Sequence, residues 1–229
     1  MMKITTIRAN SSLKCLMGMG QGKGGNGLQM SRFHGGGSLT LGLDGTVKNE
    51  VLKNLAMGFS PDGKPMCRNA GDIKRRMGYD LTISAPMSVS ILFAQADKAS
   101  RKQMLAIHQH AIAAAFQFIE QQAITRRRKT GSEDAEIVPC KLIGMAIDHT
   151  ENRNLEPQLH GHVFVPNLAV DENGNWTTFD SLRLMELQGP AGAIYRDELT
   201  KGLLQREKNM LMAHPTVHTV LPSFKKSRM

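Results

Sequence analysis

The sequence predicts an α+β fold in which helices pack on an antiparallel β-sheet. Stretches with the two-residue period of strands alternate irregularly with stretches that have the three-four period of helices, and no regular β-α-β order emerges. The 229 residues contain no internal repeat and are sufficient for one well-buried core. These observations favour an antiparallel rather than a parallel sheet.

The N-terminal part predicts one strand followed by a loop. Residues 2–8 alternate and are rich in β-branched side chains, which predicts an opening strand. Residues 18–37 are so rich in glycine that they predict a loop rather than a helix. Gly20, Gly22 and Gly25 match GxGxxG spacing, but no helix pattern follows them, so a flexible loop is favoured over a nucleotide cradle.

The middle of the chain is mainly helical. A short helix is predicted over 48–57, a strand over 79–84, and helices over 88–95 and 98–125. The last of these ends in a basic run, where cations suit the helix dipole. The run consists of Arg126, Arg127, Arg128 and Lys129. It is interpreted either as a solvated helix end or as a contact with phosphates.

The C-terminal part predicts the rest of the sheet and a final helix. Strands are expected over 136–148 and 159–170, and a further strand begins at 176–179 after a turn at 171–174. A helix is expected over 185–208. The helical period stops there, which predicts one domain over 1–208 and a divergent tail over 209–229.

Composition limits the classes of function. The net charge of +9 favours a polyanionic partner, most often nucleic acid, although a basic protein without such a ligand is as common. No apolar stretch is long enough to span a bilayer, and no secretory signal is recognisable, so a cytoplasmic protein without membrane insertion is expected. The three cysteines lack CxxC spacing and indicate reduced thiols.

Three histidines form the candidate metal site. His160 and His162 are two residues apart in a predicted strand, so both imidazoles leave the same face of the sheet. His149 ends the preceding strand, and the connection between the two strands is short enough to place His149 beside His160 and His162 on the neighbouring strand. A structural role is the ordinary alternative for each histidine alone. Together they predict a site for a divalent cation, with Zn or Mn suited to imidazole and Mg conceivable if phosphate and water complete the shell.

Two independent stretches resemble a known family. The segment "EPQLHGHVFVPN" with His149 upstream closely resembles the three-histidine motif of TrwC/TraI-type (MobF) conjugative relaxases, in the HUH endonuclease superfamily. The segment "MGYDLTISAPMSVSILFA" is similar to that family's "GYDLTFSAPKSVS" signature. Weaker matches are "LGLDG", "TRRR" and "IYRDEL", so the resemblance extends over about residues 1–208 in family order.

The resemblance implies a central five-stranded antiparallel sheet flanked by helices. It implies metal-dependent nicking and rejoining of one strand at a plasmid transfer origin, by attack of a tyrosine on a DNA phosphate. It assigns His149, His160 and His162 to the cation and Asp80 to orienting a ligand histidine. The implied partners are single-stranded DNA at the transfer origin, relaxosome accessory proteins and a secretion-system coupling protein.

The chain departs from the family pattern in three places. Its only tyrosines are Tyr79 and Tyr195, and neither lies after the first strand, where the family carries its nucleophile. Cys15 lies in that region and is a speculative substitute. Met87 stands where the signature has lysine, and residues 209–229 resemble nothing in the family, which suggests a truncated or frame-shifted copy.

Three functions therefore compete. The first is an active strand-nicking transesterase. The second is an inactive remnant that binds single-stranded DNA and metal, which the missing tyrosine favours. The third is an unrelated three-histidine hydrolase that cleaves through metal-bound water and forms no adduct with DNA.

Overall fold

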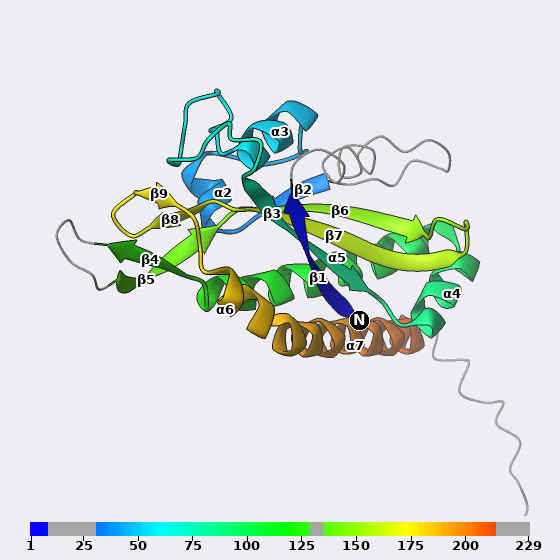
Figure 1. Ribbon diagram of the computed structural model, residues 1–229. Coiled ribbons are helices and arrows are strands. Elements are labelled where there is room, and N and C mark those ends of the chain that lie inside the picture. The colour runs from blue at the N-terminus through cyan, green and yellow to red at the C-terminus, as the bar shows by residue number, and fades with distance from the viewer. Residues whose placement is uncertain (9–30, 129–134, 214–229) are drawn as a thin grey trace, which may run out of the picture.

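The computed structural model describes residues 1–8, 31–128 and 135–213 (Figure 1). Nine strands and six helices lie in these ranges. In chain order they are β1 (Met2–Arg8), β2 (Ser31–His34), α2 (Gly36–Thr40), α3 (Asn49–Met57), β3 (Arg76–Ser84), α4 (Met87–Gln95), α5 (Lys98–Gln121), β4 (Ile124–Arg128), β5 (Ala135–Leu142), β6 (Gly144–Glu151), β7 (Pro157–Pro166), β8 (Ala169–Asp171), β9 (Trp176–Thr177), α6 (Ser181–Glu186) and α7 (Gln188–Ala213).

Five strands form a central sheet in the order β1-β3-β7-β6-β2, and every neighbouring pair is antiparallel. This confirms the predicted α+β class with a sheet of about five strands. The remaining four strands form a second sheet in the order β4-β5-β8-β9. None of the helices that the structure describes has the length and apolar character needed to cross a membrane.

The two faces of the central sheet have different coverings. The helices α5 and α7 lie side by side against one face (Figure 1). The main core fills this layer, with Leu81, Val163, Ile112 and Tyr195 among its members. A second core lies on the opposite face beneath α3 and includes Phe164. Strand alternation therefore sends successive side chains of β3, β6 and β7 alternately toward the helices and toward the other face.

Two strands predicted as single units are each divided between the two sheets. The predicted strand over 136–148 is interrupted at Ile143, so that β5 joins the small sheet and β6 the central one. Gly144 begins β6 against Phe116, whose Cζ lies 2.8 Å from where a Cβ would stand. The strand predicted over 159–170 divides after Pro166, which cannot donate to a ladder.

The predicted helix over 98–125 is too long. The helix α5 ends at Gln121, and Ile124–Arg128 form β4, so the basic run lies in a strand and not at a helix end. Because Arg126 pairs in register with Ile137 of β5, tertiary pairing overrides the helical propensity of arginine.

Three further expectations need correction. The predicted glycine loop is wrong for its last part, where β2 and α2 form; residues 9–30 lie outside the described part of the chain. The helix α2 is held because Glu120 accepts a hydrogen bond from Gly36 N at 2.7 Å. The final helical region is two helices, α6 and α7. The helical period also continues past residue 208, since α7 ends at Ala213.

Candidate functional site

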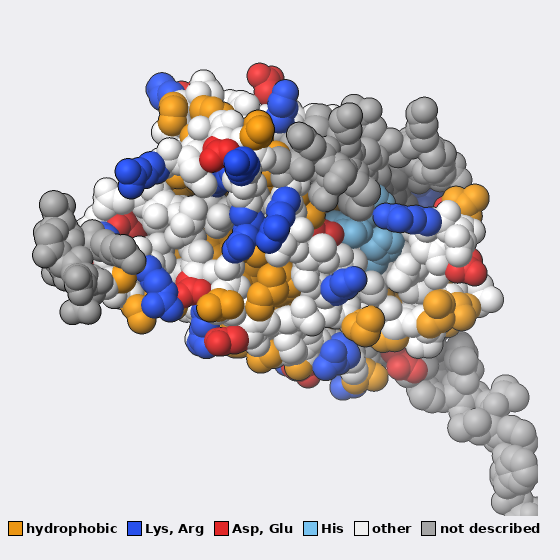
Figure 2. All heavy atoms as spheres, in the orientation of Figure 1, with side chains coloured by type: hydrophobic (Ala, Val, Ile, Leu, Met, Phe, Trp, Pro, Cys, Tyr) orange, Lys and Arg blue, Asp and Glu red, His pale blue; other side chains and the backbone are white. Residues whose placement is uncertain are grey.

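The three predicted histidines meet on one face of the central sheet. His149 of β6 pairs directly with His160 of β7, and His162 lies two residues further along the same strand. The ring centroids are 5.2 Å apart for His149 and His160, 5.5 Å for His149 and His162, and 5.3 Å for His160 and His162. Figure 2 shows histidine side chains together at the surface, with lysine and arginine side chains around them.

Hydrogen bonds orient two of these imidazoles. Nδ1 of His162 donates to the carboxylate of Asp80, at 2.8 Å from Oδ2, and Nδ1 of His160 donates to the carbonyl of Gln158 at 2.9 Å. Each ring therefore keeps Nε2 as the nitrogen with a free lone pair. Nε2 of His149 is buried and has no hydrogen-bond partner within the described residues. Such an arrangement leaves three imidazole nitrogens available to a ligand.

Burial favours the neutral form of the His149 and His160 rings at physiological pH. Desolvation, with His160 and His162 nearby, lowers the pKa of His149 to about 4. Desolvation also lowers the pKa of His160, and the neighbouring His162 adds to this effect. Because only a neutral imidazole can bind a metal through its lone pair, this environment favours coordination over protonation.

The three imidazoles lie near one another, but they are not arranged as ligands around a single point. In the described ranges, no three His, Cys, Asp or Glu side chains stand close enough together to hold a metal ion. The rings of His149 and His160 are stacked at an interplanar angle of 24°, whereas His162 is nearly perpendicular to His149. Metal–nitrogen bonds of about 2 Å would require these rings to turn toward a common point.

Asp80 and Tyr79 lie on opposite faces of the sheet, as their adjacent positions in a strand predict. Asp80 is on the histidine face, where Thr82 also contacts it through a 3.2 Å hydrogen bond from its hydroxyl. Tyr79 points to the opposite face, where it is buried and receives a hydrogen bond from Arg76. Tyr195 is fully buried on α7 and hydrogen-bonds Nδ1 of His108 at 2.8 Å. Cys15 lies outside the described residues.

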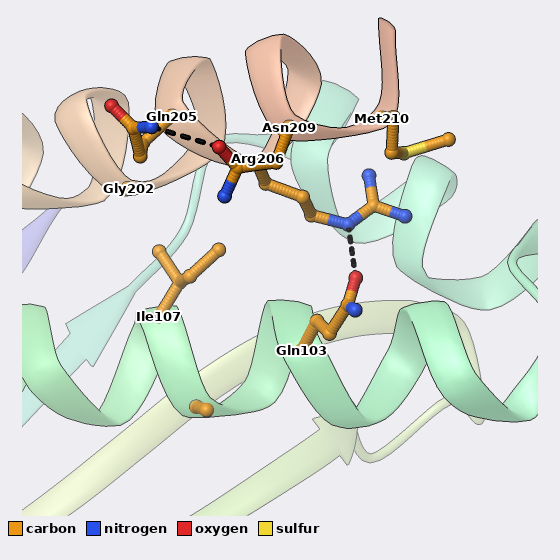
Figure 3. Close-up of a pocket in the computed structure, with 8 residues that line it drawn as sticks. Gln103, Ile107, Gly202, Gln205, Arg206, Asn209 and Met210 are labelled. Atoms are coloured by element: carbon orange, nitrogen blue, oxygen red, sulfur yellow. Dashed lines mark hydrogen bonds between the residues drawn. The ribbon is translucent and has the colours of Figure 1, made fainter. Parts of the chain in front are cut away.

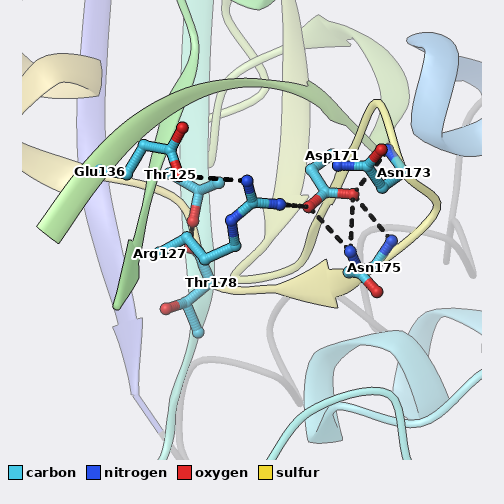
Figure 4. A network of polar contacts seen from close by, with 7 residues as sticks. All are labelled: Thr125, Arg127, Glu136, Asp171, Asn173, Asn175 and Thr178. Atoms are coloured by element: carbon cyan, nitrogen blue, oxygen red, sulfur yellow. Dashed lines mark hydrogen bonds and ion pairs between the residues drawn. The ribbon is translucent and has the colours of Figure 1, made fainter. Parts of the chain in front are cut away.

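Two arginines of the basic run form ion pairs with acidic side chains. Arg126 pairs with Asp180 at 2.8 Å. Figure 4 shows Arg127 between Glu136 and Asp171, at 3.1 and 3.4 Å. Asp171 in turn accepts hydrogen bonds from the backbone of Asn173 and Asn175 in the β8–β9 turn. Arg126 therefore connects the small sheet to the start of α6, and Arg127 connects β4 to β5 and β8.

Sequence reasoning missed the polar cluster beneath the histidines. Asp148 is 1% exposed on the helix side of β6, where it forms an ion pair with Arg32 of β2 and accepts a 2.8 Å hydrogen bond from Gln109 of α5. The signal was available, because Asp148 directly precedes His149 and must face the other way. The cluster links the edge strand β2, the histidine strand β6 and the helix layer.

A groove of about 630 Å³ lies between α5 and α7, and none of the predicted site residues lines it (Figure 3). Its lining includes Ile107, Gly202 and Arg206, the last of which donates a 3.0 Å hydrogen bond to Gln103. The helices that line the groove, α5 and α7, cover one face of the sheet (Figure 1), whereas the three histidines project from the other face. The candidate site is therefore the histidine face of the sheet and not this groove.

Fold and site together define an α+β protein with three histidines and a supporting carboxylate on adjacent antiparallel strands. The family model of the TrwC relaxase matches residues 23–210. The multifunctional conjugation protein TraI of Escherichia coli strain K12 is 34% identical over 178 residues, covering 77% of this chain and 10% of TraI. The chain belongs to the TrwC relaxase family, and it spans about a tenth of the length of the curated relatives it matches.

Solved structures agree with this assignment. A metal-bound structure of the conjugative relaxase TrwC in complex with OriT DNA has a TM-score of 0.79 and 26% sequence identity. A metal-free structure of the same kind of complex has a TM-score of 0.76, also with 26% identity. Each match covers 90% of this chain and 70% of the TrwC chain.

Proposed function

We propose that this chain acts on single-stranded plasmid DNA at a transfer origin, as a metal-dependent nicking and rejoining relaxase. The observation that carries the proposal is the convergence of His149, His160 and His162 on one sheet face, with Asp80 bound to His162. Membership of the TrwC relaxase family supports it, as do relatives whose structures contain OriT DNA. The net charge of +9 suits a polyanionic substrate.

The donor set fits a divalent cation. Among the residues that the structure describes, the buried Nε2 of His149 has no hydrogen-bond partner, and His160 and His162 form their hydrogen bonds through Nδ1. These three residues would hold Mg, Mn or Zn, and a cation there would polarise a phosphate oxygen of the DNA. Asp80 would keep His162 in the required tautomer and raise its basicity as a ligand.

The nucleophile decides between two functions. Transesterification needs a protein group to attack phosphorus, forming a covalent link to the 5′-phosphate while the 3′-oxygen leaves as a hydroxyl. Tyr79 and Tyr195 are both buried away from the histidine face and cannot reach a phosphate there. Cys15 remains a speculative candidate. This burial favours the second function, a relaxase-derived protein that binds single-stranded DNA and metal without cutting.

The remaining assignments follow from the family. We include Arg126, Arg127 and Arg128 as DNA contacts, although Arg126 and Arg127 would have to exchange carboxylate partners for phosphates. Relaxosome accessory proteins and a secretion-system coupling protein are proposed partners, and the cytoplasm is the proposed location. The unit that performs these functions is proposed to be residues 1–208.

Labelled oligonucleotides distinguish the proposed functions. The chain is incubated with Mn²⁺ and a candidate transfer-origin strand carrying a 5′ or a 3′ label, and the products are separated on a denaturing gel. A protein adduct on the 3′-labelled fragment, which carries the 5′-phosphate at the nick, supports the active relaxase. Binding without cleavage supports the inactive protein. Cleavage without an adduct would contradict both and indicate hydrolysis by metal-bound water.

A further inference from the structure

The edge strand β1 shares the face of the sheet that carries the histidines. Its residue Lys3 pairs with Thr82 of β3, and Thr82 pairs in turn with His162 of β7. Residues paired directly across antiparallel strands project from the same face. Lys3, Thr82 and His162 therefore form one row that runs across three strands.

The row places a lysine close to the candidate metal centre. Adjacent strands lie about 4.8 Å apart, so the Cα atoms of Lys3 and His162 are separated by roughly 10 Å. Thr82 alone stands between them in this row, and its side chain is short. The four-carbon stem of lysine is flexible enough to carry its ammonium over the neighbouring strand.

Lys3 is an exposed cation without an acidic partner. In the part of the chain that the structure describes, it forms no ion pair. On this face Asp80, two residues before Thr82 in β3, is 8% exposed and already accepts hydrogen bonds from His162 and Thr82. Arg126 and Arg127, by contrast, are paired with carboxylates in the small sheet.

We propose that Lys3 binds a backbone phosphate of single-stranded DNA, next to the phosphate held at the histidines. An exposed ammonium beside a phosphate-binding centre neutralises one further charge of the strand and releases its counterion. The bound strand then crosses the sheet from β7 toward β1, along the row of His162, Thr82 and Lys3. This inference rests on the proposed function and adds a path for the substrate.

The test is the salt dependence of binding. Affinity for a fluorescent single-stranded oligonucleotide is measured by anisotropy from low to moderate salt, with EDTA present so that no cation bridges to DNA. For single strands the slope of log affinity against log salt is about −0.7 for each phosphate neutralised. Lys3→Gln should therefore make the slope shallower by about 0.7, whereas Lys3→Arg should retain it.

Lys102→Gln provides the matched control. Lys102 is exposed on α5, in the layer against the opposite face, and its replacement removes the same charge. This variant should keep the wild-type slope. If Lys3→Gln and Lys102→Gln change the slope equally, the effect is one of net charge and the inference is wrong.

The inference and the proposed function can fail separately. If wild type and Lys3→Gln bind DNA with the same slope, Lys3 makes no phosphate contact, while the proposed function stands. If Lys3→Gln alone is shallower but no adduct forms in the nicking assay, the DNA path is supported although cutting is not. Absence of DNA binding by wild type would overturn both.

Discussion

The carboxylate of Asp80 lies 2.8 Å from Nδ1 of His162, although the two residues are 82 positions apart in the chain. They are on the neighbouring strands β3 and β7, and both side chains are 12% exposed. Asp80 accepts the Nδ1 proton, so the lone pair of His162 is directed through Nε2. This pair joins the "GYDLT" segment to the histidine motif and makes them one site.

Replacing Asp80 by Asn should weaken metal binding without removing a ligand. The amide is a poorer acceptor for the Nδ1 proton, so His162 loses basicity and a fixed tautomer, with a loss of about 10–100-fold in Mn²⁺ affinity. Isothermal titration of the purified protein measures this loss. Asp197→Asn, at an exposed position on α7, is the control and should bind as wild type does. Equal affinity for Asp80→Asn would exclude the orienting role.

His162→Ala should lower metal occupancy by more than about tenfold, because one of three proposed ligands is lost. Metal content is measured by mass spectrometry after equilibration with Mn²⁺ at a concentration that half-saturates wild type. His110→Ala is the control, since that ring is exposed on α5 and pairs with Glu198. Unchanged occupancy in His162→Ala would contradict the three-histidine centre.

Gly161→Ala should destabilise the protein by about 1–3 kcal/mol, the usual cost of overpacking a core. A Cβ at this position would stand 2.5 Å from Cδ1 of Ile112 and 3.2 Å from Oδ1 of Asp148. The free energy of unfolding is measured by urea denaturation. Gly189→Ala should be neutral or slightly stabilising, since nothing lies within 4 Å of its added Cβ.

The cause of this destabilisation can be tested with a second substitution. Ile112→Val removes the Cδ1 atom and should cost about 0.5–1.5 kcal/mol alone. The double variant should lose less free energy of unfolding than the sum of the losses in the two single variants, because removing Cδ1 relieves the clash with the new Cβ. Strict additivity would show that Ile112 does not restrict position 161.

Stability should fall as the pH is lowered from about 6.5 toward 4, and His108 should contribute to this fall. Desolvation lowers the pKa of His108 from 6.5 to about 4, so between these values the unfolded chain binds the additional proton. The contribution is complete above pH 6.5 and is lost toward pH 4, with a slope of at most about 1.4 kcal/mol per pH unit. Urea denaturation of metal-free protein at several pH values measures it.

His108→Gln should make this pH dependence shallower. The pKa values of His34 and His149 are also lowered to about 4 by burial, so these two residues would maintain the rest of the pH dependence. His110→Gln controls for loss of an imidazole from the same helix. An unchanged slope in His108→Gln would mean that this ring does not titrate on unfolding.

Local sequence patterns anticipated much of the fold. The alternation over Met2–Arg8 predicted β1, and the helix predicted over 48–57 corresponds to α3. Strand periodicity also placed Tyr79 and Asp80 on opposite faces, as observed. These features depend on neighbouring residues, and such short-range rules are readable along the chain.

The points at which the chain passes from one sheet to the other could not be predicted from such local patterns. The chain passes from β5 to β6 at Gly144, where an added Cβ would meet Phe116 of α5, a contact that the sequence neighbours of Gly144 do not reveal. The arginines Arg126 and Arg127 suit a helix by propensity, yet pairing with β5 places them in a strand.

The sequence by itself determined the fold class and the common face of His160 and His162, because a strand repeats every two residues. That His149 joins them on this face was decided by the register of β6 against β7. Only the tertiary structure decided that Asp148 lies under them in a buried cluster with Arg32 and Gln109, and that Lys3 belongs to the row of His162. Those relationships are set by strand order and register, which join residues far apart in the chain through packing that no local pattern encodes.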